Sequence, residues 1–140
     1  MNNHQVLVNQ LIDLAISEDI GDGDHTSLAC IPSNAHGEAR LLIKEQGIIA
    51  GIELAKLVFD KIDSSLVFTQ VINDGDFVKN NDVAFYVEGN SQSILKAERL
   101  ALNFMQRMSG IATKTNSYAQ LISDLPTKIL DTRKTTPGNR

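Results

Sequence analysis

The sequence predicts an α+β protein: a mixed module of helices and short strands, then a long helix, then the start of an alternating strand–helix region. Three observations predict this class. Apolar residues recur at helical spacing in three segments, of which the last is much the longest. Short runs rich in branched residues are separated by turns rich in glycine, asparagine and aspartate. Near the end, the apolar pair Ile129–Leu130 leads directly into a cationic loop rich in hydroxyls.

The first two thirds of the chain contain the mixed module. Residues 4–18 are predicted to form a helix, and a loop that contains Gly21 and Gly23 ends this helix. Residues 52–62 fit a second, shorter helix by the same spacing. The expected strands cover residues 38–43, 48–51, 66–72 and 83–87, with turns at 45–47, 73–76 and 79–82.

The long helical segment follows, with Ser93 as its expected N-cap. Its apolar positions continue to Pro126, either as one helix or as two helices broken near Gly110. A terminal strand around Ile129–Leu130 is expected next, and Pro137–Gly138 then predicts a turn.

The composition excludes several classes of protein. A net charge of −4 argues against a general nucleic-acid binder, which needs a basic surface. No apolar stretch approaches the roughly 20 residues that span a bilayer, so no membrane partner is expected. Cys30 is the only cysteine and the first residues lack a signal-peptide pattern, so the sequence favours a reducing, cytoplasmic location.

The loop after the expected terminal strand is the first candidate site. It presents Thr132, Arg133 and Lys134, followed by two further threonines. Two cations and several hydroxyls at the tip of a strand suit a carboxylate or a phosphate, and each charge-assisted hydrogen bond contributes roughly 1.5–3 kcal/mol. The alternative is a charged loop that merely closes a strand.

One face of the long helix is the second candidate. Its polar residues fall within about a third of a turn at roughly 100° per residue, and four of them are cationic while none is acidic. These residues are Lys96, Arg99, Asn103, Gln106, Arg107, Gly110 and Lys114. A stripe of one sign indicates an anionic ligand or a partner subunit, whereas a solvated helix face is the alternative.

The acidic loop at residues 19–24 invites a calcium site but does not match one. The position at which an EF-hand supplies its bidentate glutamate is Cys30. His25 has no second ligand at zinc-binding spacing. The loop is therefore expected to supply hydrogen bonds for turns and a helix cap, and no metal site is predicted in this chain.

Taken together, these segments resemble the quinolinate phosphoribosyltransferase family, which belongs to the type II phosphoribosyltransferases. The resemblance runs in order over essentially the whole chain, and its two longest motifs are specific. The matching segments are residues 18–26 (EDIGDGDHT), 47–51 (GIIAG), 74–76 (DGD), 98–113 (ERLALNFMQRMSGIAT) and 128–138 (KILDTRKTTPG).

The resemblance implies an architecture and a reaction. It implies an N-terminal open-sheet α/β sandwich domain over residues 1–108, with residues 109–140 beginning a C-terminal atypical α/β barrel. The implied reaction transfers phosphoribosyl from phosphoribosyl pyrophosphate to quinolinate. Loss of CO2 then gives nicotinate mononucleotide, in de novo NAD biosynthesis. Mg²⁺ and a homodimer or higher homo-oligomer are also implied.

The resemblance also implies roles for four residues. Arg99 matches a family arginine that reaches across the dimer to quinolinate, and Thr132, Arg133 and Lys134 match substrate-binding residues at the end of the first barrel strand. Later barrel strands, which carry the family's phosphoribosyl-pyrophosphate and metal residues, do not occur in these 140 residues. The chain alone is therefore expected to be inactive, and no catalytic residue is assigned.

Three other interpretations stay open at this point. A molybdenum-transport-associated paralogue of the same fold shares the Arg133–Lys134 pair. A non-catalytic, truncated dimerisation fragment is the second. The third is a biotinyl or lipoyl carrier with Lys79 at a hairpin tip, although the flanking residues do not fit that pattern.

Overall fold

A computed structural model describes residues 3–136. The helices are α1 (Asn3–Ile20), α2 (His25–Cys30), α3 (Ile52–Ile62) and α4 (Ser91–Leu121). The strands are β1 (His36–Leu42), β2 (Gly47–Ile48), β3 (Val67–Gln70), β4 (Phe77–Val78) and β5 (Val83–Asn90). The predicted mixture of helices and open sheet is confirmed.

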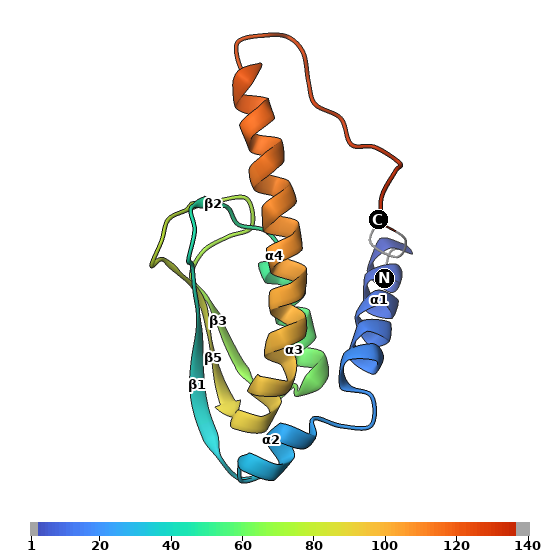
Figure 1. The fold of residues 1–140 in the computed structure, drawn as a ribbon, viewed down its shortest axis with the longest axis vertical. Helices are drawn as coiled ribbons and strands as arrows, with labels where there is room; N and C mark the ends of the chain where they lie inside the picture. Colours follow the sequence, from blue (N-terminus) through green and yellow to red (C-terminus); the bar gives the residue numbers. More distant parts are fainter. Residues whose placement is uncertain (1–2, 137–140) are drawn as a thin grey trace.

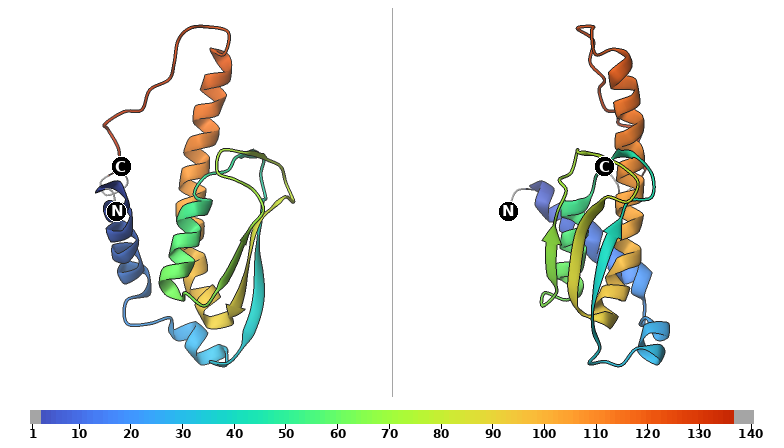
Figure 2. Two further views of the ribbon diagram at one scale, coloured as in Figure 1. Left: turned by 180° about the vertical axis from the view of Figure 1, so that it is seen from behind. Right: turned by 90° about the vertical axis from the view of Figure 1, so that its left-hand side faces the viewer.

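A three-stranded antiparallel sheet forms one layer, in the order β1-β5-β3. Helices α3 and α4 pack together against one face of this sheet, and α1 lies outside them as a further layer (Figures 1 and 2). Strands β2 and β4 pair separately as a short second sheet. In the part of the chain that the structure describes, no helix covers the opposite face of the main sheet, so the sheet is open (Figure 2).

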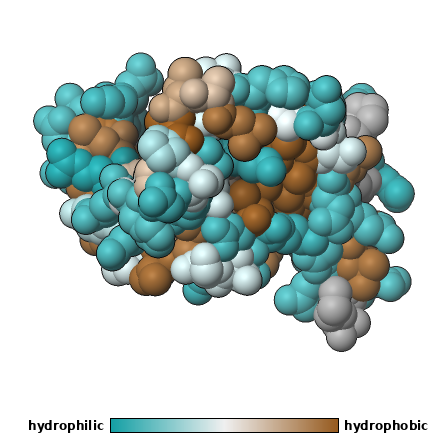
Figure 3. Space-filling view, turned by 90° about the horizontal axis from the view of Figure 1, so that it is seen from below, coloured by the Kyte–Doolittle hydropathy of each residue, from teal (hydrophilic) through white to brown (hydrophobic). Residues whose placement is uncertain are grey.

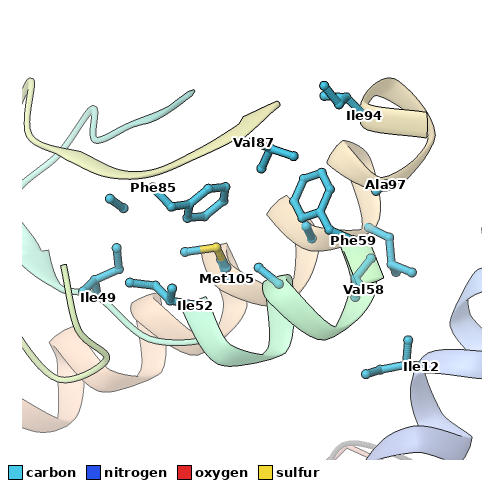
Figure 4. Close-up of a cluster of buried hydrophobic side chains, with 14 of the residues drawn as sticks. Ile12, Ile49, Ile52, Val58, Phe59, Phe85, Val87, Ile94, Ala97 and Met105 are labelled. Carbon is cyan, nitrogen blue, oxygen red and sulfur yellow. The ribbon is translucent and has the colours of Figure 1, made fainter. Parts of the chain in front are cut away.

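The core lies between the main sheet and helices α3 and α4. Phe85 and Val87 of β5 face Phe59 of α3 and Met105 of α4, and all four side chains are buried (Figure 4). The rings of Phe59, Phe68 and Phe85 lie 4.5–6.1 Å apart between centroids, within the range of favourable aromatic pairs. Ala55 of α3 and Ala97 and Ala101 of α4 are small and buried, which allows the two helices to approach closely.

Helix α1 attaches to this core at a few points. Ile12 is fully buried on the α3 side of α1 (Figure 4). Asp13 accepts a hydrogen bond from Lys61 of α3 at 2.5 Å. Leu7 and Leu14 on the same helix stay more than 60% exposed. Seen from the end where α2 lies, the surface is mostly hydrophilic and a hydrophobic patch interrupts it (Figure 3).

Helix α3 begins at a cap supplied from a distant turn. Gly51 precedes the helix with φ of 100° and has no side chain to offer. Asp74 accepts hydrogen bonds from the backbone N–H groups of Ile52 at 2.8 Å and Glu53 at 3.2 Å. These two N–H groups are among the four that a helix leaves without partners at its N-terminus. The motif at residues 74–76 therefore has a structural role.

Helix α4 is a single helix, so the alternative break at Gly110 is wrong. A glycine costs a helix interior only about 1 kcal/mol, which packing along the rest of the helix outweighs. The N-cap is Asn90, whose side chain accepts a hydrogen bond from the Ser93 N–H at 3.1 Å, and not Ser93 itself. Ser93 instead donates its hydroxyl hydrogen to Asp63 at 2.7 Å.

The strand predicted around Ile129–Leu130, the expected first strand of the barrel, is absent. Residues 126–136 have no regular secondary structure, and Leu130 is 84% exposed. A strand is stabilised by pairing with a neighbour, and none of the described strands pairs with this segment. The expected turn at Pro137–Gly138 lies outside the described residues. Helix α2 and strand β4 were not predicted.

Candidate functional site

Arg99 lies on α4 opposite the C-terminal end of α1, where Asp19 holds it. The Arg99 Nε donates to Asp19 Oδ1 at 2.8 Å, and Nη2 donates to Asp19 Oδ2 at 3.0 Å. Nη2 also donates to the Asp19 backbone carbonyl at 3.1 Å. The Arg99 side chain is 65% exposed, whereas that of Asp19 is 19% exposed. Arg99 is therefore both anchored and open to solvent.

The same contact changes the protonation equilibrium of Arg99. Hydrogen bonds to Asp19 raise the pKa of Arg99 above its ordinary value, and the carboxylate's charge adds to the effect. The guanidinium remains a permanent cation, which suits it to an anionic ligand.

The loop that follows Asp19 is fixed by its own hydrogen bonds. The Gly21 N–H donates to the Ser17 carbonyl at 3.1 Å, and the Gly23 N–H donates to the Ile20 carbonyl at 2.9 Å. Asp24 caps α2 by accepting from the Ser27 N–H at 3.1 Å and the Ser27 hydroxyl at 2.6 Å. These bonds lower the pKa of Asp24, with a smaller contribution from the charge of Arg99.

The expectation that this acidic loop supplies caps and turns is confirmed for Asp24. Asp22 lies 3.3 Å from the His25 ring, and both side chains are highly exposed. Within residues 3–136, no group of three or more histidine, cysteine, aspartate or glutamate side chains could hold a metal ion.

The terminal cluster Thr132, Arg133 and Lys134 is exposed on an extended segment. The Lys134 N–H donates to the Thr132 hydroxyl at 3.2 Å, which shapes a local turn. Nearby, Thr136 accepts a hydrogen bond from Arg107 of α4.

The structure does not bring Arg99 and the terminal cluster together. The terminal segment leaves the far end of α4 and returns toward the N-terminal end of α1, whereas Asp19 and Arg99 lie at the C-terminal end of α1 (Figure 1). The two predicted parts of the site therefore occupy opposite ends of α1 within this chain.

The one-signed face of α4 divides into parts with different surroundings. Arg99 faces the end of α1, and Arg107 contacts the terminal segment. Lys114 lies over the ring of Tyr118, with Nζ 5.0 Å from the ring centroid, a cation–π contact. Gln106, Gly110 and Lys114 line a groove of about 710 Å³ between α4 and the β1–β2 region. Neither Arg99 nor the terminal cluster lines this groove.

Two hydroxyls on α4 that the sequence interpretation missed bind the backbone at the end of strand β2 and just after it. Thr113 Oγ1 accepts from the Ile48 N–H at 2.9 Å, and Ser109 Oγ accepts from the Ala50 N–H at 2.9 Å. Their spacing of four residues places them on the same side of α4, facing alternate residues of the chain. Strand β2 is shorter than the strand predicted at residues 48–51, because its partner β4 contains only two residues.

Asp19 was also missed as a partner of Arg99. Eighty positions separate the two residues, and neither periodicity nor spacing relates positions so far apart in the chain. One signal was available in the sequence. Asp19 lies in the last turn of α1, where a negative charge is unfavourable and no basic residue of the same turn offsets it. A cation from another part of the chain could therefore be expected there.

Known proteins of one family resemble this chain closely. Residues 24–109 match the family model described as "Quinolinate phosphoribosyl transferase, N-terminal domain". A Nicotiana tabacum protein named quinolinate phosphoribosyltransferase [decarboxylating] 1b is 51% identical, over 93% of this chain and 37% of its own length. An Arabidopsis thaliana protein named nicotinate-nucleotide pyrophosphorylase [carboxylating], chloroplastic, is 48% identical over the same shares.

Comparison with solved structures points to the same family as comparison with sequences. The nicotinate-nucleotide pyrophosphorylase from Francisella tularensis superposes with a TM-score of 0.88 at 39% identity, over 94% of this chain and 47% of that one. The present chain thus spans less than half the length of each of these relatives. It belongs to the quinolinate phosphoribosyltransferase family and contains that family's N-terminal domain.

Proposed function

We propose that this chain acts as the N-terminal part of a transferase that moves phosphoribosyl from phosphoribosyl pyrophosphate to the ring nitrogen of quinolinate. Loss of the neighbouring carboxylate as CO2 gives nicotinate mononucleotide and pyrophosphate, a step of de novo NAD biosynthesis. The observation that carries the proposal is family membership over residues 24–109 together with an exposed, anchored Arg99.

The chemistry of quinolinate suits the cations on this chain. Quinolinate is a dianion, so its two carboxylates need charge-assisted donors that offset the loss of water and fix the ring. In the proposal Arg99 forms one wall of the quinolinate site and contacts one carboxylate. Thr132, Arg133 and Lys134 form the second wall and contact the substrate from there. Cations around the ring also stabilise negative charge that develops as CO2 leaves.

The two walls lie at opposite ends of α1 in this chain, and a homodimer resolves that separation. We propose that Arg99 of one subunit and the terminal cluster of its partner meet at a shared site. The proposed division places residues 1–108 in the N-terminal domain and residues 109–140 at the start of the barrel. Helix α4 then crosses this boundary without a break and joins the two parts rigidly.

Magnesium does not fit the residues at hand. The described part of the chain offers no group of three or more metal-binding side chains, so we derive no step through the ion. In the proposal, Mg²⁺ accompanies the pyrophosphate group at residues that this chain does not supply.

The cellular location is a proposal as well. Among the described residues, every helix is too short or too polar to cross a membrane. The single cysteine favours a reducing compartment, which we propose to be the cytoplasm. The name of the Arabidopsis relative places that protein in the chloroplast, so localisation of a tagged protein is the direct test.

The activity is tested by following nicotinate mononucleotide and CO2 from quinolinate and phosphoribosyl pyrophosphate with magnesium present. A full-length protein carrying this chain is expected to form both products in equal amounts. The purified 140-residue chain is expected to form neither, because the quinolinate-side cations alone do not hold phosphoribosyl pyrophosphate. Product from the short chain, or none from the full-length protein, contradicts the proposal.

A further inference from the structure

We infer that Asp19 is a positioning residue that fixes the Arg99 guanidinium so that Nη1 alone remains free for a ligand carboxylate oxygen. The inference deepens the proposed function and rests on it, because the ligand carboxylate belongs to quinolinate. It is carried by the three hydrogen bonds between the two residues and by their unequal exposure.

The free donors of Arg99 can be counted. A guanidinium carries five N–H donors, one on Nε and two on each Nη atom. Asp19 accepts from Nε and accepts twice from Nη2, through its two carboxylate oxygens and its backbone carbonyl. Among residues 3–136, no hydrogen bond from Nη1 is found, so two donors on one nitrogen face outward.

This arrangement dictates how an anion can bind. Each bidentate edge of a guanidinium uses Nη2, which already makes two hydrogen bonds to Asp19. A ligand carboxylate therefore meets Nη1 by itself, through one oxygen, and the direction of approach is set by Asp19. The pair is also close to neutral, so Arg99 orients the carboxylate while other cations supply most of the attraction for a dianion.

The anchor is rigid at the Asp19 end. Asp19 lies in the last turn of α1, where a negative charge is unfavourable and unpaired carbonyl groups point outward. Arg99 offsets the negative charge because it brings a cation to that end of the helix, and it also donates a hydrogen bond to the Asp19 carbonyl. The hydrogen bonds of Gly21 and Gly23 then hold the following loop in place.

A purely structural role for the pair is the competing explanation, since Arg99 also attaches α1 to α4. The two explanations differ in what Asp19→Asn changes. An asparagine keeps one acceptor oxygen and loses the charge and the second acceptor, so Nη2 or Nε is released and the guanidinium can rotate. A structural role predicts lower stability with unchanged substrate preference, whereas positioning predicts a selective loss for quinolinate.

The first measurement uses the 140-residue chain and needs no activity. In ¹⁵N NMR spectra, the Arg99 Nε–H signal is expected to exchange slowly with water in the native chain and at least tenfold faster in Asp19→Asn. Asp22→Asn, which removes an exposed carboxylate of the same loop, is the control and should leave that signal unchanged. Equal exchange in the native chain and Asp19→Asn overturns the inference, because the clamp is then not formed.

The second measurement uses the full-length protein that carries this chain. Asp19→Asn is expected to raise KM for quinolinate about tenfold with little change in KM for phosphoribosyl pyrophosphate, and Asp19→Glu should recover part of the loss. An unchanged or lower KM for quinolinate overturns the inference. If Asp19→Asn leaves KM for quinolinate unchanged, Arg99→Ala shows which assignment is wrong. When Arg99→Ala also leaves this KM unchanged, the role of Arg99 in the proposed function fails. When Arg99→Ala raises it, only the role of Asp19 fails.

Discussion

Thr113 on helix α4 and Gly47 at the start of strand β2 are in such close contact that no side chain fits between them. A Cβ atom built on Gly47 lies 2.5 Å from Thr113 Oγ1 and 3.2 Å from its Cγ2. The Thr113 hydroxyl accepts from the N–H of the next residue, Ile48, at 2.9 Å. The glycine that opens the motif at residues 47–51 is thus required by packing against the helix.

Gly47→Ala is therefore expected to destabilise the protein by about 1–3 kcal/mol, because Thr113 is branched at Cβ and has little freedom to rotate away. Urea unfolding of the 140-residue chain measures this loss. In a double-mutant cycle with Thr113→Ala, the two changes together should cost less than their sum.

Gly110→Ala is the control for that experiment. A Cβ at Gly110 meets nothing within 4 Å, and the residue lies inside α4. Alanine is a better helix former, so a gain of about 0.5–1 kcal/mol is expected. Similar losses at both glycines would show that the contact with Thr113 is not the cause.

Asp74→Ala should remove the cap of α3 and destabilise the chain by about 1–2 kcal/mol. Asp74→Asn keeps one acceptor oxygen for the Ile52 and Glu53 N–H groups and should lose less than half as much. Thermal unfolding followed by circular dichroism separates the two variants. An equal loss in both would show that one neutral acceptor oxygen does not maintain the cap.

The pH dependence of stability should carry a signature of Asp63. Hydrogen bonds from Ser65, and then from Ser93, lower the pKa of Asp63 below its ordinary value of 3.8. A carboxyl whose pKa is lower in the folded state stabilises the protein above the ordinary pKa. That contribution is lost as the pH falls below 3.8 through the lowered value. The urea midpoint is therefore expected to fall between pH 5 and pH 2.5.

Ser65→Ala tests this assignment, because it removes the largest cause of the shift. The fall in midpoint between the two pH values should become smaller in the variant. Ser123→Ala, on an exposed serine that bonds only a backbone carbonyl, serves as the control. The assignment to Asp63 is wrong if Ser65→Ala and Ser123→Ala have the same pH dependence.

A shared site between subunits predicts complementation. In full-length protein, Arg99→Ala subunits and Lys134→Ala subunits are each expected to be impaired when alone. Mixed and allowed to exchange, they should regain up to about a quarter of the native activity, because one of the two sites in each mixed dimer is intact. Mixtures that stay as inactive as their components would place both residues in a site within one chain.

The elements that local spacing specifies were predictable, and those that depend on distant partners were not. Residues 52–62 fit α3 because that helix carries a clear apolar face. Residues 4–18 fit α1 because apolar residues recur at helical spacing, although Leu7 and Leu14 stay exposed and Ile12 is the residue that is buried. Strand β4 contains two residues between two turns, too short for any period to show. Ile129–Leu130 looks like a strand by composition, but a strand also needs a partner, which the described residues do not supply.

The candidate site divides in the same way. Arg99 stood out because its charge belongs to a one-signed helix face and to a family motif. Asp19 lies far away in sequence and was interpreted only as part of a capping loop, so the pair became visible through the packing of α1 beside α4. Similarly, nothing in the spacing of Ser109 and Thr113 indicated that their hydroxyls bind the backbone at residues 48–50.

The central claim, that Arg99 serves quinolinate binding, is tested most directly by steady-state kinetics of Arg99→Ala in the full-length protein. Lys56→Ala is the control, because it removes an exposed cation from α3, a helix that contributes no residue to either wall of the site. KM for quinolinate is expected to rise at least tenfold in Arg99→Ala, with KM for phosphoribosyl pyrophosphate within about twofold of the native value and Lys56→Ala unchanged. Equal rises for both substrates, or no rise for quinolinate, would contradict the account.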